Sequence, residues 1–114
     1  MNYTVEEKSF QFAVQIVNLC RVLTTSKKEF ILSKQLLRSG TSIGANIAEA
    51  QQAQSRADFI SKLSIALKEA SETDYWLRLL KATSFITDSE FTSIIGECRE
   101  IEKMLTAIIK SSKQ

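Results

Sequence analysis

The chain contains no histidine and no proline among its 114 residues, and it has only three glycines and two cysteines. Without histidine it lacks the usual base of serine and cysteine hydrolases and the commonest protein metal ligand. Without proline, and with so little glycine, many tight turns and β-hairpins lack the residues that they require. These absences favour an all-α protein.

Long hydrophobic runs are also absent. No stretch approaches the roughly 20 consecutive apolar residues of a membrane span. The first twenty residues carry Glu6, Glu7 and one lysine in place of the basic start and apolar run of a signal peptide. We therefore expect a cytoplasmic protein with no membrane partner, and the length fits a single domain over residues 1–114.

The two cysteines, Cys20 and Cys98, lie far apart, and each has apolar neighbours at helical spacing. Neither belongs to a C-x-x-C motif. We expect both to be buried as small hydrophobic residues.

Four hydroxyl residues are each followed, three positions later, by a carboxylate at the start of an apolar pattern. This spacing is that of the helix capping box. The pairs are Thr4 with Glu7, Ser26 with Glu29, Ser55 with Asp58, and Thr87 with Glu90. They predict helices over residues 5–24, 27–52, 56–83 and 88–112. Because the connections are short, we expect an antiparallel up-down-up-down four-helix bundle.

Apolar residues within the predicted helices recur at alternating spacings of four and three, which is typical of bundle-facing stripes. The 5–24 helix carries two such stripes side by side. The 88–112 helix carries Ile95, Met104 and Ile109 outside its main stripe. We therefore expect apolar surface left over for self-association into a homo-oligomer.

Residues 40–44 spell G-x-S-x-G, the sequence of a hydrolase nucleophile elbow. That elbow needs a preceding strand and a histidine, and neither is available. The alternation of four and three continues without a break from Leu32 to Ala53, which favours a helix over the alternative of a phosphate-binding loop at residues 39–46. We therefore expect no catalytic residue here.

Small residues instead give this helix a structural role. Gly40, Gly44 and Ala48 form a ridge without bulk that lets another helix approach closely. Ser39 and Asn46 occupy polar positions in the heptad seam. Asn46 has two interpretations: a buried residue that fixes register or oligomer state, or an asparagine bonded to a neighbouring side chain.

Three glutamates, Glu49, Glu69 and Glu72, are expected near an interface. If the chain turns back near residue 54, Arg38 lies level with residue 70 and can pair with Glu69 or Glu72. A di-metal bundle would need Glu-x-x-His motifs, which this chain cannot supply. We expect no metal and no other cofactor.

Two blocks of sequence resemble a known family. Residues 35–50 are very similar to the signature of bacterial four-helix-bundle proteins named after open reading frames in 23S rRNA intervening sequences. Residues 58–59, 62–70 and 72–77 resemble the third helix of that family. The two blocks together cover about half of the chain.

The resemblance implies a cytoplasmic bacterial bundle, a homopentamer, and no known enzymatic activity. Related bundles include the pentameric accessory protein of diversity-generating retroelements, which is thought to bind nucleic acid through a basic surface. Ser42, Asn46, Glu49 and Glu72 match signature positions to which the family gives no catalytic role.

The predicted topology gathers six basic residues at the end that holds the first and third connections. They are Arg21, Lys27, Lys28, Lys34, Arg78 and Lys81, opposed by Glu29, Asp88 and Glu90. We expect an assembly that binds RNA or DNA phosphates without reading bases, since lysines are available but no recognition motif or run of stacking aromatics is. The alternatives are ordinary solvated lysines or a protein-interaction scaffold.

Overall fold

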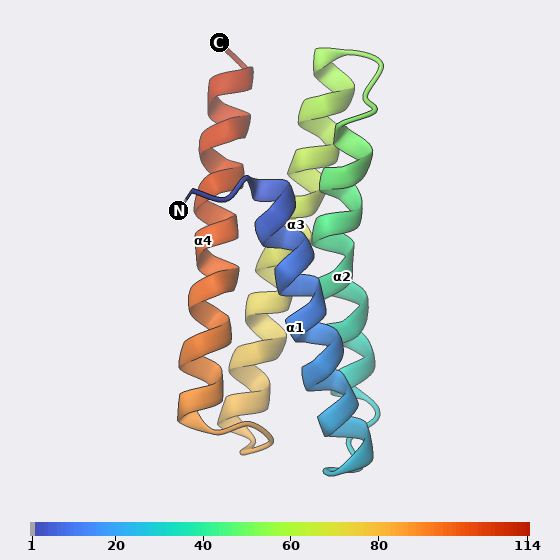
Figure 1. The fold of residues 1–114 in the computed structure, drawn as a ribbon, viewed down its shortest axis with the longest axis vertical. Helices are drawn as coiled ribbons and strands as arrows, with labels where there is room; N and C mark the ends of the chain where they lie inside the picture. Colours follow the sequence, from blue (N-terminus) through green and yellow to red (C-terminus); the bar gives the residue numbers. More distant parts are fainter. Residues whose placement is uncertain (1) are drawn as a thin grey trace.

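The computed structural model describes residues 2–114 as four helices, and all four are long. They are α1 (Val5–Thr25), α2 (Leu32–Ala50), α3 (Arg56–Ala82) and α4 (Asp88–Ser112). Figure 1 shows that α1 and α3 run in one direction and α2 and α4 in the other. Each helix packs against its chain neighbours, and α1 also contacts α4. The predicted all-α, up-down-up-down bundle is confirmed.

Three of the four predicted helix starts are confirmed by their caps. Thr4 and Glu7 form a complete capping box on α1, and Thr87 and Glu90 form one on α4. At α3, Ser55 Oγ accepts a hydrogen bond of 3.0 Å from the backbone N–H of Asp58. These side chains bond to backbone groups that have no partner within the helix.

The predicted start of the second helix is wrong, because α2 begins at Leu32 and not at residue 27. Ser26 instead ends α1, and its N–H donates to Val22 O at 2.9 Å. Lys28 then takes a left-handed backbone conformation with φ of 54°, which a right-handed helix cannot include. Glu29 caps α2 from outside, since its carboxylate accepts the N–H of Ser33 at 2.8 Å.

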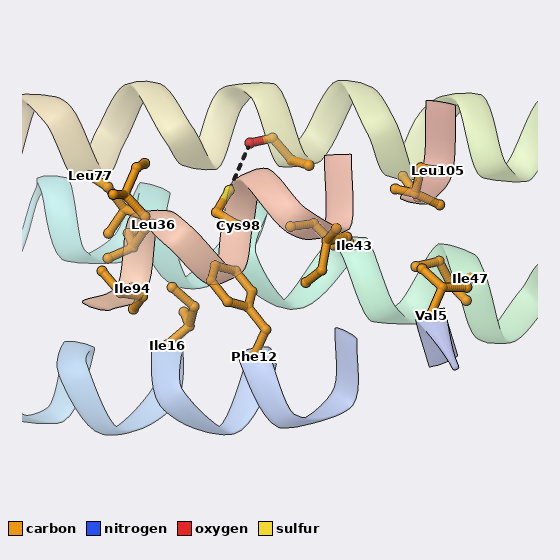
Figure 2. Close-up of a cluster of buried hydrophobic side chains, with 14 of the residues drawn as sticks. Val5, Phe12, Ile16, Leu36, Ile43, Ile47, Leu77, Ile94, Cys98 and Leu105 are labelled. Carbon is orange, nitrogen blue, oxygen red and sulfur yellow. Dashed lines mark hydrogen bonds between the residues drawn. The ribbon is translucent and has the colours of Figure 1, made fainter. Parts of the chain in front are cut away.

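The core fills the space between the four helices. Figure 2 shows buried side chains from every helix meeting there, among them Phe12, Ile16, Ile43 and Leu77. In α3 and α4, the residues near the middle of each helix that face the core are buried, whereas Phe59, Phe91 and Ile108, nearer the helix ends, are only partly buried.

Both cysteines are buried, as predicted. The Cys20 thiol donates to Ser33 O of α2 at 3.4 Å, and the Cys98 thiol donates to Ala70 O of α3 at the same distance (dashed line in Figure 2). Burial, helped by the charge of Glu29, raises the pKa of Cys20 to about 11. Burial also raises the pKa of Cys98. Neither thiol is therefore a reactive thiolate.

The predicted register of α2 is right at Ser39 and wrong at Asn46. Ile47 is buried where the heptad placed Asn46, which is half-buried and donates from Nδ2 to Ser42 O of its own helix at 2.8 Å. The physical reason is that a straight helix has 3.6 residues per turn, so a 3.5-residue repeat drifts away from the buried face.

The two glycines of α2 lie against α1. A Cβ atom built on Gly40 would lie 2.8 Å from Cγ2 of Ile16, and one on Gly44 would lie 3.4 Å from the backbone oxygen of Ser9. Close helix approach is therefore confirmed at Gly40, whereas a Cβ on Gly44 would make ordinary van der Waals contact with Ser9. Ala48, the third member of the predicted ridge, is exposed.

We expect Gly40→Ala to destabilise the protein by about 1–3 kcal/mol, because the new methyl group overlaps Ile16. Gly96 in α4 is the matched control, since a Cβ there meets no atom within 4 Å. Gly96→Ala should stabilise the protein by about 1 kcal/mol through helix propensity. Urea denaturation measures both changes, and equal or greater stability for Gly40→Ala would contradict the close approach.

A second prediction concerns the end of α3, where Ser84 has φ of 65° and the N–H of Phe85 donates to Leu80 O at 2.9 Å. This is a Schellman ending, in which glycine normally takes the left-handed position. Ser84→Gly should therefore raise the free energy of unfolding by about 1 kcal/mol. Ser93→Gly, at an exposed position within α4, should lower it by about 0.5–1 kcal/mol. If thermal denaturation shows that both variants lose stability, the assignment of this ending is wrong.

Candidate nucleic-acid interface

The α1–α2 and α3–α4 connections lie at the same end of the bundle, the lower end in Figure 1. Arg21 lies near the end of α1, Lys27 and Lys28 lie in the α1–α2 connection, and Lys34 lies in the first turn of α2. The other two predicted residues, Arg78 and Lys81, occupy the last turns of α3. All six are exposed. Whether they bind nucleic acid stays a prediction.

Four of these six side chains form no ion pair within residues 2–114. We call this set, which consists of Arg21, Lys27, Lys28 and Lys34, the free basic group.

Lys27 also lies close enough to the start of α4 to act on Glu90. Hydrogen bonds from the backbone and side chain of Thr87 lower the pKa of Glu90, and the charge of Lys27 lowers it further. Lys27 of the free basic group therefore lies near the α3–α4 connection, which ends at the start of α4.

Arg78 and Lys81, unlike the free basic group, each form an ion pair with an acidic side chain. Arg78 Nε lies 2.8 Å from Asp74 Oδ1, and Arg99 of α4 binds the other oxygen of the same carboxylate at 2.9 Å. Burial acts to raise the pKa of Asp74, but the hydrogen bonds and charges of Arg99 and Arg78 outweigh burial and hold it below its usual value. Lys81 Nζ lies 4.7 Å from the centre of the Phe91 ring and 3.9 Å from Asp88. Acidic residues thus already balance part of this charge.

Two large apolar side chains stand beside the free basic group. Phe30 is 60% exposed and Ile31 is 76% exposed, and both follow Lys27 and Lys28 in the α1–α2 connection. Sequence reasoning missed them because it placed them inside a helix. The available signal was their position between Lys28 and Lys34, directly after the two lysines.

The predicted pairing of Arg38 with the glutamates of α3 is confirmed. Arg38 Nη1 lies 3.0 Å from Glu69 Oε2, and Arg38 Nη2 binds Glu72 Oε2. Trp76 Nε1 donates to the same Glu72 oxygen at 3.0 Å. These contacts fasten α2 to α3.

Two further predicted residues link the same helices. The hydroxyl of Thr73 donates to Ser39 Oγ at 2.9 Å in the buried seam. Lys62 Nζ lies 3.3 Å from Glu49 Oε1 at the surface. These contacts lie within one chain, so a role for these residues between copies stays a prediction.

The G-x-S-x-G motif is wholly helical, so the phosphate-loop alternative for residues 39–46 is wrong. Ser42 Oγ donates to Arg38 O at 2.7 Å along its own helix. Its hydroxyl therefore satisfies a helix carbonyl and is not held on the strained turn that a nucleophile elbow requires.

Two negative findings apply to the part of the chain that the structure describes. Across residues 2–114, no three or more Cys, Asp or Glu side chains are grouped so as to hold a metal ion. Over the same residues, no helix combines the length and the apolar character that crossing a membrane requires.

Of the two helices predicted to leave apolar surface over, α1 does so and α4 largely does not. Ile95 and Ile109 are buried and Met104 is half-buried, so α4 contributes little. The outer face of α1 carries Phe10, which is 70% exposed, and Val14.

Phe10 also borders a groove of about 540 Å³ between α1 and α2. Small residues of α2, among them Gly44, Ala45 and Ala48, line the opposite side of this groove.

Comparisons with known proteins agree with the sequence resemblance. One structural neighbour is a protein of unknown function from the S23 ribosomal protein family of Bacteroides thetaiotaomicron, with 62% sequence identity and a TM-score of 0.93. The alignment covers 94% of this chain and 99% of that one. A comparison with curated proteins found no match.

The profile of the family described as 23S rRNA-intervening sequence protein matches residues 1–107. This match covers α1, α2, α3 and most of α4, including the G-x-S-x-G segment and the Arg38–Glu69–Glu72 contacts between α2 and α3. The chain therefore belongs to the 23S rRNA-intervening sequence protein family.

Proposed function

We propose that this protein is a non-enzymatic, cytoplasmic, oligomeric bundle that binds RNA or DNA through the free basic group. The observation that carries the proposal is the charge of residues 21–34, which include four basic residues and a single acid, Glu29. All four basic side chains are exposed and, within residues 2–114, form no ion pair.

The one acid of this segment offsets the basic charge only in part. The Glu29 carboxylate accepts backbone N–H groups from Ser33 at 2.8 Å and Ile31 at 3.2 Å. Burial acts to raise the pKa of Glu29, but these backbone bonds outweigh it and lower the pKa. Glu29 thus stays charged and directed at the start of α2, while the lysines remain available for phosphates.

Phosphate contacts position a nucleic acid without reading its sequence. Flexible lysine side chains at the end of a helical hairpin suit that role, because an ammonium group binds phosphate as a point charge. The family description refers to 23S rRNA intervening sequences, and the neighbour belongs to a ribosomal protein family. Both descriptions support nucleic acid as the partner.

Absence of catalysis is part of the proposal. The chain has no histidine, and the hydroxyl of Ser42 is bonded to its own helix. Both thiols are buried with a raised pKa. Neither Ser42 nor the two cysteines is therefore an activated nucleophile.

A protein-interaction scaffold is the second candidate function. It is favoured by the exposed Phe10 and Val14 of α1 and by the apolar groove beside Phe10. We propose that a second copy of this chain covers this face, in a homopentamer as the family resemblance implies. Several copies would multiply the free basic group.

The binding proposal is tested by titrating the protein with labelled RNA and DNA at several salt concentrations. Affinity should fall steeply with salt, and Lys27→Ala/Lys28→Ala/Lys34→Ala should weaken it. The slope of log affinity against log salt should become shallower by roughly 0.7–0.9 for each phosphate that the variant no longer neutralises.

The matched control removes three exposed lysines elsewhere, by Lys68→Ala/Lys103→Ala/Lys110→Ala. This variant has the same net charge as the first. Equal weakening by the two variants would show binding by overall charge only, and no binding at low salt would favour the scaffold.

Self-association is tested by sedimentation velocity at micromolar concentration. The wild-type protein should sediment as an oligomer, and Phe10→Glu should shift it toward smaller species because a charge then enters the buried face. Gln11→Glu, at the next exposed position, adds the same charge and should leave the oligomer intact. A wild-type protein that sediments only as a monomer would contradict the prediction.

A further inference from the structure

Phe30 is an exposed aromatic residue in the same connection as Lys27 and Lys28, which form no ion pair within residues 2–114. It lies in the α1–α2 connection, two residues after Lys28 and four before Lys34. Its side chain is 60% exposed. Exposing a phenyl ring to water is unfavourable, so a partner that covers the ring would gain free energy.

Hydrogen bonds fix the backbone on both sides of Phe30. Before it, the N–H of Glu29 donates to Leu23 O at 2.9 Å, where α1 ends. After it, the N–H of Ile31 donates to Glu29 Oε2 at 3.2 Å. The ring is therefore presented from a well-anchored connection, which lowers the entropy lost on binding.

Two other aromatic side chains near basic residues, Phe91 and Tyr75, already have partners. Phe91 lies under Lys81 and packs against the core. Tyr75 packs edge-on against Trp76, with ring centres 5.1 Å apart, and also contacts Arg78. Phe10 is also exposed, but it borders the groove between α1 and α2 near the start of α1, far along the helix from the lysines of the α1–α2 connection, although a shallow pocket along α1 is lined by both Phe10 and Arg21. Phe30 thus combines exposure with neighbouring free charge.

The charge and the ring select different properties of a partner. Lys27, Lys28 and Lys34 favour a polyanion, and the phenyl ring favours a flat apolar surface. Single-stranded nucleic acid offers both, because its phosphates alternate with bases that can leave the stack. In a duplex the bases are stacked on one another and cannot lie on the ring.

We infer that the α1–α2 connection binds single-stranded nucleic acid, with Phe30 stacked on an unpaired base and the lysines on flanking phosphates. This inference rests on the proposed function and names the form of nucleic acid that the site selects. The sequence had suggested no stacking aromatic, because Phe30 was placed within a helix. Stacking tolerates any base, so binding without sequence readout is retained.

The test compares a short labelled single strand with its blunt duplex, using the full chain at low salt. Wild-type protein should bind the single strand more tightly. Phe30→Ala should weaken single-strand binding roughly 5- to 150-fold, the range for loss of one stacked base, and leave duplex binding unchanged. Phe30→Trp should keep single-strand affinity and add fluorescence that the single strand quenches.

Ile31→Ala is the matched control, because Ile31 is the adjacent exposed apolar residue but has no aromatic face. It should leave single-strand affinity nearly unchanged. If Ile31→Ala weakens binding as much as Phe30→Ala, the contact is not stacking. Equal loss of single-strand and duplex binding, or a changed oligomer in Phe30→Ala by sedimentation, would also overturn the inference.

Two further results separate this inference from the proposal on which it rests. If the triple lysine variant loses binding while Phe30→Ala does not, phosphate binding stands and stacking is wrong. If wild-type protein binds neither form, both fail. Binding to phosphatidylserine vesicles that is lost in Phe30→Ala and Ile31→Ala would assign the connection to a membrane surface and overturn the inference.

Discussion

The position of α1 depends on the absence of a side chain at Gly40. Ile16 lies only 2.8 Å from where a Cβ atom on Gly40 would be, and one turn further along, the backbone of Ser9 lies beside Gly44. Within residues 2–114, the only ion pair between α1 and α4 joins Lys8 and Glu100 at 2.9 Å. Since α1 is placed mainly by α2, the connection between them is part of a tightly packed helical hairpin. That hairpin fixes where the free basic group stands.

Local signals predicted most of the fold. Helix starts at Thr4, Ser55 and Thr87 depend on hydrogen bonds between the cap residue and the residue three positions later, so the local sequence is enough to predict them. The Ser26 and Glu29 pair has the same spacing but serves two different helix ends, because Lys28 adopts a left-handed conformation between them. Asn46 and Ile47 were exchanged because a heptad repeat approximates the real helical period. Both errors concern backbone geometry that residue types specify weakly.

The sequence predicted which basic residues lie at the candidate site but not which of them form ion pairs. All six basic residues lie at the predicted end, since topology alone determines that placement. Tertiary contacts determine which of these side chains form ion pairs. For example, the Asp74 carboxylate that binds Arg78 is shared with Arg99 of another helix. No spacing rule could have revealed that contact. The exposure of Phe30 also became visible only once the true start of α2 was known.

The reactivity of the two buried thiols reports on separation of the helices. Cys20 donates across to α2 and Cys98 donates across to α3, so each sulfur lies at the contact of one helix pair. Because burial raises the pKa of Cys20 to about 11, only on the order of one thiol in 10⁴ is ionised at neutral pH, and modification must wait for the helices to separate. The rate at which a thiol reagent labels Cys20 therefore reports how often α1 separates from α2, and the rate at Cys98 reports the same for α4 and α3.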